Sequence, residues 1–166
     1  MRILGIDPGT ATTGFGVVEE DSQGQLIAIG YGTIITPPDM AVEKRLLSIY
    51  EQLKEIILLY KPQAAAVEKL FFYKNVTTAM AVGQSRGVVV LSFAQAGLPI
   101  GEYTPLEVKQ AVTGYGNADK KQIQQMVKVL LNLETIPKPD DAADALAVAI
   151  CHHNSSRYAQ MEEMEI

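Results

Sequence analysis

Four acidic side chains stand where an α/β protein could bring them together. Asp7 follows the apolar run of residues 2–6, and Glu68 ends a second apolar run over residues 63–67. Asp141 and Asp144 are three residues apart in an alanine-rich segment, so on an α-helix they would share one face. If the two strands are parallel neighbours, their carboxylates meet at one edge of the sheet, where the helix can add its pair.

Carboxylates held this close would raise one another's pKa values unless a cation offsets their charge. The set offers hard oxygen ligands with neither cysteine nor histidine, which selects Mg²⁺ or Mn²⁺. Two such ions about 3.5–4 Å apart are a common device for cutting phosphodiesters. The acids therefore indicate a metal-dependent phosphodiester chemistry.

The elements that must position these acids begin with three predicted strands. Residues 2–6 form a short buried strand that ends at Asp7, and Pro8 and Gly9 turn the chain. Strands at residues 14–20 and 26–36 follow, which predicts an antiparallel meander. The glycines of the second strand allow another backbone to approach it closely.

Helices and strands alternate along the rest of the chain. The expected elements are a helix at 41–60, a strand at 63–68, a helix at 75–96, a strand at 100–103, helices at 104–114 and 119–131, and a last helix from about residue 140. The helix at 75–96 is apolar almost all round, so it needs two partners, and another subunit is a candidate for one of them. The expected fold class is α/β, a five-stranded mixed sheet flanked by helices.

Length and composition indicate one domain. The chain has 166 residues, 48% of them hydrophobic, which is enough for a substantial core. No apolar run approaches the roughly 18 residues of a membrane span, and there is no signal-like N-terminus, so a cytoplasmic protein is expected. Cys151 is the only cysteine, which excludes an internal disulfide. We expect Cys151 to pack as a small apolar residue.

The charge is unevenly distributed. The net charge of −5 is atypical of a nucleic-acid-binding protein. Residues 69–128, however, contain seven basic and three acidic side chains and carry a net charge of +4. This segment is the candidate surface for a phosphate-rich partner.

The two ends of the last helix have predicted caps. Asp140 is a natural N-cap residue, while His152 and His153 are expected to lie at the C-terminal end rather than to bind metal. Residues 154–166 are polar and acidic and are predicted to form a disordered tail, which leaves residues 1–153 as the folded domain.

Several separated motifs together resemble the RuvC family of Holliday-junction resolvases. They are Ile3-Leu4-Gly5-Ile6-Asp7-Pro8-Gly9 with Gly14-Phe15-Gly16, the Val67-Glu68 strand end followed by Phe71, and Asp141-Ala142-Ala143-Asp144-Ala145. The resemblance runs in order from Met1 to about His153.

This resemblance implies a ribonuclease-H-like fold and a homodimer that makes paired nicks in opposite strands of a four-way DNA junction during recombination and repair. It further implies dependence on Mg²⁺, with two ions per subunit and Mn²⁺ as a substitute, and a branch-migration motor as partner. The implied catalytic and metal-binding residues are Asp7, Glu68, Asp141 and Asp144. The implied DNA-binding residues are Phe71, which matches a base-stacking aromatic, Lys109 and Lys120 near the active site, and the adjacent Lys121.

Alternatives remain open at this level. Asp7-Pro8-Gly9-Thr10 also resembles the first phosphate loop of actin- and sugar-kinase-like proteins, although the second phosphate loop and the adenosine-binding Gly-Gly of that group are missing. A catalytically idle DNA-binding module and a nuclease for structured RNA are further alternatives. The three lysines could form a solvated helix face, and Asp140 could act in place of Asp141.

Overall fold

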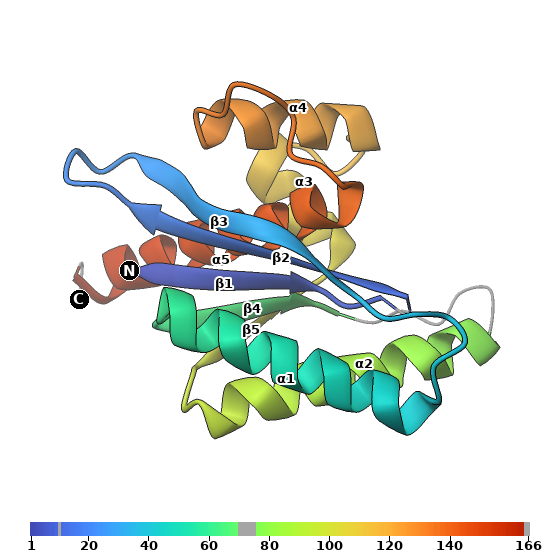
Figure 1. The fold of residues 1–166 in the computed structure, drawn as a ribbon. Coiled ribbons are helices and arrows are strands. Elements are labelled where there is room, and N and C mark those ends of the chain that lie inside the picture. The colour runs from blue at the N-terminus through green and yellow to red at the C-terminus, as the bar shows by residue number, and fades with distance from the viewer. Residues whose placement is uncertain (10, 70–75, 165–166) are drawn as a thin grey trace.

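A mixed five-stranded sheet forms the centre of the computed structural model, which describes residues 1–9, 11–69 and 76–164 (Figure 1). Its strand order is β3-β2-β1-β4-β5. Strands β1 (Arg2–Asp7), β2 (Thr12–Glu20) and β3 (Leu26–Ile35) form an antiparallel meander. Strands β4 (Ala64–Glu68) and β5 (Ile100–Tyr103) extend the sheet in parallel from β1. The predicted meander and mixed sheet are confirmed.

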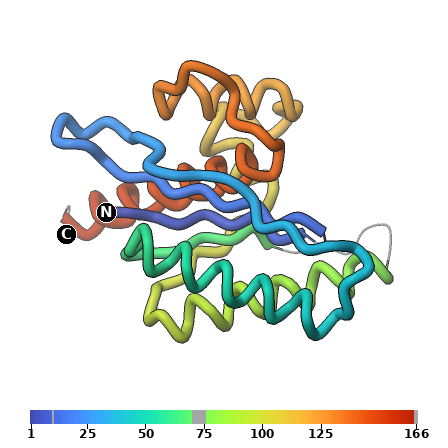
Figure 2. The backbone as a smooth tube through the Cα atoms, in the orientation of Figure 1, coloured from blue at the N-terminus to red at the C-terminus, as the bar shows by residue number. Residues whose placement is uncertain are grey.

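Helices cover both faces of the sheet, as the tube in Figure 2 shows most clearly. Helices α1 (Val42–Tyr60) and α2 (Val76–Gln95) lie on one face. Helices α3 (Pro105–Thr113), α4 (Lys120–Leu130) and α5 (Asp140–Met164) lie on the other. The order of elements is the one that the sequence predicts.

Strand β1 supplies side chains to both cores. Ile3 packs in the core beneath α3, α4 and α5, whereas Leu4 and Ile6 pack in the core beneath α1 and α2, and all three are fully buried. This alternation follows from the two-residue period of a strand, and burial on both faces explains why the run is continuously apolar. Asp7, at the end of this run, therefore follows a strand that is buried on both faces.

Helix α5 packs directly against the backbone of β1 and β2. A Cβ atom built on Gly5 would lie 2.2 Å from the backbone oxygen of Ala145, and one on Gly16 would lie 2.7 Å from the side chain of Leu146. This approach is possible because Gly5 and Gly16 have no side chains and the facing part of the helix is rich in alanine. The glycines of β2 thus admit another backbone, as the sequence predicts.

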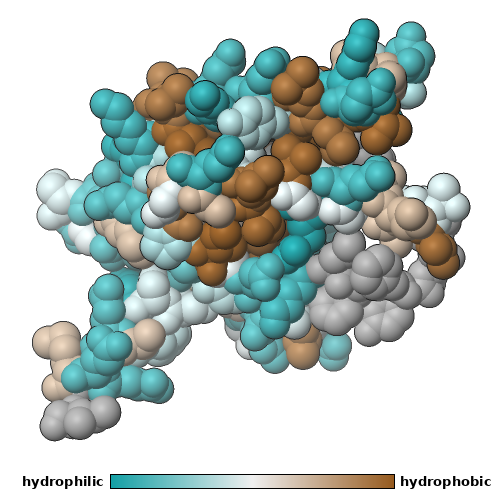
Figure 3. All heavy atoms as spheres, turned by 90° about the horizontal axis from the view of Figure 1, so that it is seen from below, coloured by the Kyte–Doolittle hydropathy of each residue, from teal (hydrophilic) through white to brown (hydrophobic). Residues whose placement is uncertain are grey.

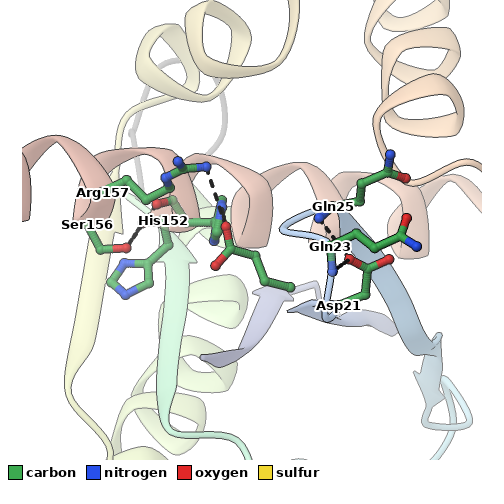
Figure 4. A network of polar contacts seen from close by, with 8 residues as sticks. Asp21, Gln23, Gln25, His152, Ser156 and Arg157 are labelled. Atoms are coloured by element: carbon green, nitrogen blue, oxygen red, sulfur yellow. Dashed lines mark hydrogen bonds and ion pairs between the residues drawn. The ribbon is translucent and has the colours of Figure 1, made fainter.

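Helix α5 is longer than predicted. It continues to Met164, so residues 154–164 are helical, although the sequence predicts a disordered tail there. A propagating helix gains one hydrogen bond for each residue that it fixes, and Arg157 Nη1 ties this part to the sheet at 3.4 Å from Glu20 Oε1 (Figure 4).

The histidines of α5 are interior helix residues, so their predicted position at a helix end is wrong. His152 Nδ1 lies 2.7 Å from the Tyr103 hydroxyl, and the backbone oxygen of His152 accepts a hydrogen bond from Ser156 (Figure 4). His153 is buried, with Nε2 3.5 Å from Glu20 Oε1. Both side chains therefore serve packing between α5 and the strands.

Two predictions about composition are also met. Cys151 is buried in the core as a small apolar residue. Among the helices of the described ranges, none has the length and apolar character needed to cross a bilayer.

Candidate functional site

Three of the four predicted acids form one cluster. Asp7, at the end of β1, and Asp141 and Asp144, on the first turns of α5, each place a carboxylate oxygen so that all three lie within 4.8 Å of one another. Glu68 lies outside this group. It nevertheless lines the same cleft of about 170 Å³ as Asp7, Asp144 and Lys109. The cleft thus joins the ends of two strands to the start of a helix.

Strand pairing explains why Asp7 and Glu68 share one edge. β1 and β4 are parallel neighbours, with Ile6 opposite Val67, so the chain leaves both strands on the same side of the sheet. The next residues are the two acids. This is the arrangement that the sequence predicts for neighbouring strands of the same direction.

Gly14 explains why Asp141 reaches Asp7. Gly14 is the register partner of Asp7, and a Cβ atom built on it would lie 1.9 Å from the backbone oxygen of Asp141. The first turn of α5 therefore rests directly on the backbone of β2. A larger residue at this position would displace the helix that carries two of the acids.

The cluster carries more negative charge than its surroundings stabilise. Burial, with the neighbouring charges of Asp144, Glu68 and Asp141, raises the pKa of Asp7 to about 8. Burial and the charge of Asp144 raise the pKa of Glu68, although Lys109 opposes this shift. Burial also raises the pKa of Asp144, against the opposing charge of Lys120. All three pKa values are raised, as expected for clustered carboxylates whose charge no cation offsets.

The two lysines implied near the active site do lie beside it. Lys109 follows the start of α3, where Thr104 and Glu107 form the reciprocal capping bonds that the sequence predicts, and it lines the acidic cleft. Lys120 is the first residue of α4, and its Nζ lies 3.2 Å from Asp140 Oδ2 and 3.9 Å from Asp144 Oδ2. Each lysine therefore lies near one of the four acids, Lys109 near Glu68 and Lys120 near Asp144.

Of the two remaining DNA-binding candidates, only Lys121 can be placed, and it is not brought together with the acids. Lys121 lines a separate surface hollow with Tyr115 and Gln125. Phe71 lies outside the described residues.

Asp140 does not have the predicted capping contact. It is the first residue of α5, and its carboxylate points to α4, where Oδ1 accepts a hydrogen bond from Gln124 Nε2 at 3.1 Å and Oδ2 contacts Lys120. Gln124 is a residue of the site that the sequence analysis missed. Its position four residues after Lys120, hence on the same face of a predicted helix, was the available signal.

A larger groove of about 480 Å³ lies between α1 and α2, on the opposite face of the sheet. Its lining is mostly apolar: Tyr50, Lys54, Ile57, Leu58, Ser92, Gln95 and Ala96. It holds no cluster of carboxylates among these residues, so the smaller acidic cleft is the candidate site on chemical grounds.

The donor set of the cleft fits a hard divalent cation. Asp7, Asp141 and Asp144 offer only carboxylate oxygens, and their spacing allows one ion to contact all three. Glu68 lines the same cleft and offers a further carboxylate. The structure has a central mixed sheet, with acids at the ends of its parallel strands and at the start of a crossing helix. This combination defines the ribonuclease-H-like class.

Known proteins extend this assignment. The family model of Crossover junction endodeoxyribonuclease RuvC matches residues 3–152. The protein of that name from Syntrophomonas wolfei is 53% identical over 163 residues, which is 98% of this chain and 94% of the relative. The structure of Thermus thermophilus RuvC is 35% identical, with a TM-score of 0.89 over 96% of this chain and 97% of that one. The structure of the same Thermus protein in complex with Holliday junction substrate is 32% identical, with a TM-score of 0.86 and coverage of 95% and 96%.

The chain therefore belongs to the RuvC family of crossover junction endodeoxyribonucleases. This membership confirms the family and the ribonuclease-H-like fold expected from the sequence.

Proposed function

We propose that this protein resolves four-way DNA junctions by Mg²⁺-dependent nicks in opposite strands, with Asp7, Glu68, Asp141 and Asp144 as the metal ligands. The observation that carries the proposal is the group of three carboxylates within 4.8 Å of one another, with Glu68 in the same cleft. The choice of substrate is supported by the Thermus relative, whose structure contains a Holliday junction.

When bound, the divalent ions supply Lewis-acid stabilisation of phosphate charge and a water nucleophile of lowered pKa. The residues of the chain prepare this chemistry. The carboxylates would hold metal in their charged forms, and burial beside the other acids raises the pKa of Asp7 to about 8, so Asp7 would give up a proton on becoming a ligand. Lys109 and Lys120 lie beside the acids and would neutralise the oxygens of a phosphate drawn into the cleft.

The same proposal includes a homodimer formed through α2. This helix exposes Val76, Met80 and Leu91 along one face, and Figure 3 shows apolar patches on the side of the molecule that α1 and α2 form. Gly87 lies on the same helical face, and a Cβ atom built on it would meet nothing within 4 Å. A helix of a second copy could approach closely at this point.

Two further parts of the proposal concern DNA and a partner. Phe71, three residues after Glu68 in the sequence, would stack on a base unpaired at the centre of the junction, and such stacking contributes about 1–3 kcal/mol. Lys121 would add a contact to the DNA backbone. A branch-migration motor that presents the junction is the partner implied by the family resemblance.

The experiment that tests this function compares three substrates: a synthetic four-way junction, linear duplex DNA and an RNA hairpin, each with and without Mg²⁺. We expect symmetric nicks in the junction only, and only with the ion. Equal cutting of the duplex or the hairpin would contradict the selectivity, and cutting in the presence of EDTA would contradict the metal site.

A further inference from the structure

The feature that carries a further inference is the contact between Asp140 and Lys120 at the rim of the acidic cleft. Lys120 Nζ lies 3.2 Å from Asp140 Oδ2 but 3.9 Å from Asp144 Oδ2. Only the first of these is a hydrogen-bond distance. Asp140, which is not one of the clustered acids, is thus the residue that holds the ammonium group.

Asp140 is itself held in place. Its second carboxylate oxygen accepts a hydrogen bond from Gln124 Nε2 at 3.1 Å. Lys120 and Gln124 are four residues apart on α4 and so lie on one helical face, which meets the first turn of α5. One carboxylate therefore links α4 to α5, with a separate donor on each oxygen.

This link has little value for stability. The side chains of Lys120 and Asp140 are each 58% exposed, and ion pairs so exposed to solvent typically contribute little to folding. The charge of Asp140 is also unfavourable for a surface that must accept phosphates. Neither stability nor DNA affinity therefore explains why residue 140 is an acid. The contact that holds Lys120 in place does explain it.

We propose that Asp140 is a positioning residue that holds Lys120 beside the metal site while Asp144 is free to bind metal. An ammonium group has three N–H donors. With one donor on Asp140, another can contact a phosphate oxygen in the cleft without drawing Asp144 away from an ion. The inference rests on the proposed function, because it assigns a role in cutting the junction.

The proposal predicts that binding and cutting change in opposite directions. Asp140→Asn removes a negative charge near DNA, so the Kd for a synthetic four-way junction, measured without Mg²⁺, should stay equal or fall. The misplaced Lys120 should lower the single-turnover rate with Mg²⁺ by about tenfold. The melting temperature should stay within about 1 °C of wild type because the pair is exposed.

A matched control is available one residue from Lys120. Asp119 carries the same charge, but its carboxylate accepts from the backbone N–H of Gln122 at 2.8 Å in the capping box of α4. Asparagine caps a helix about as well as aspartate. Asp119→Asn should therefore cut the junction at the wild-type rate, although it makes the same change in net charge.

The decisive comparison places Asp140→Asn in a Lys120→Ala background. If Asp140 acts through Lys120, the second change should alter the rate there by less than about twofold. An undiminished tenfold loss in that background, a wild-type rate for Asp140→Asn alone, or a rate loss that accompanies weaker binding and lower melting temperature would each overturn the inference. A wild-type protein that leaves the junction uncut overturns the proposed function as well, whereas failure of the variants alone overturns only the role of Asp140.

Discussion

At the scale of single residues, the central fact is that acids are held together against their own repulsion. Burial and the neighbouring acids raise the pKa of Asp7 to about 8, so the folded chain favours a proton on this carboxylate. A divalent cation would relieve the same repulsion. The site can therefore be examined both by chemistry on DNA and by stability without DNA.

The first prediction separates binding from cutting. Asp7→Asn removes a metal ligand and a negative charge, so cleavage of a four-way junction should fall by at least about 100-fold while junction affinity stays equal or rises. Gel-shift and single-turnover assays measure the two effects. Asp39→Asn, an exposed acid before α1, is the control and should behave like wild type. Residual cleavage within tenfold of wild type would exclude Asp7 from the metal site.

The second prediction concerns pH and stability in the absence of metal. The pKa of Asp7 is about 8 in the folded protein against an ordinary value of 3.8, so the folded state binds the proton more tightly than the unfolded chain. The resulting stability is complete below about pH 4 and is lost as the pH rises through about 8. The raised pKa values of Glu68 and Asp144 act in the same direction.

The melting temperature of metal-free protein should accordingly fall between about pH 5 and about pH 8. Asp7→Asn should flatten this slope and melt about 2–4 °C above wild type at the upper end. Mg²⁺ should raise the melting temperature of wild type at that pH more than that of the variant. A slope unchanged by the substitution would show that Asp7 is not the group that titrates.

At the scale of elements, the site depends on how closely α5 approaches the meander. Gly5 and Gly16 leave room for the middle of the helix, and Gly14 leaves room for its first turn. The capping boxes of α3 and α4 fix the starts of the two helices that carry Lys109 and Lys120. The edge of the sheet, the start of α5 and the helices α3 and α4 therefore meet at one cleft.

The third prediction tests this approach. Gly14→Ala places a methyl group at 1.9 Å from the backbone oxygen of Asp141, so α5 must move. We expect the free energy of unfolding to fall by about 1–3 kcal/mol. The cleavage rate should fall by a larger fraction of its wild-type value than the free energy of unfolding does. Gly32→Ala is the control, because its Cβ would lie 3.0 Å from the ring of Phe15, whose side chain can shift. Equal cleavage by both variants would contradict the role assigned to Gly14.

At the scale of the whole molecule, the two faces of the sheet differ in chemistry. The face of α3, α4 and α5 carries the acidic cleft. The face of α1 and α2 carries exposed apolar side chains, which form patches in Figure 3. A junction has two strands to cut symmetrically, and a two-fold dimer would present two such clefts. The apolar stripe of α2, formed by Val76, Met80 and Leu91, is our candidate for the contact between copies.

The fourth prediction concerns this dimer. The protein should sediment as a dimer at micromolar concentration, and Leu91→Lys should shift it toward monomer by burying a charge at the contact. Leu59→Lys is the control, because Leu59 is 70% exposed on α1 and outside the stripe of α2. Wild-type protein that sediments only as monomer would contradict the dimer and the coordinated nicks with it.

The sequence by itself determined the elements and the chemistry of the site. Periods of two and 3.6 residues, capping boxes and glycine or proline stops act within a few residues, so they can be found without knowing the rest of the fold. The three clustered acids were predicted for the same reason: each is marked by a local signal, a strand end for Asp7 and one helical face for Asp141 and Asp144.

Only the tertiary structure decided which of these groups touch. Asp141 reaches Asp7 because Gly14 leaves the space, and these residues are far apart in the chain. The partner of Asp140 was missed since a local rule, the preference of aspartate for N-caps, gave way to a contact with another helix. Polar composition likewise failed to reveal that α5 continues to Met164, because a helix already anchored by its buried half extends at little cost.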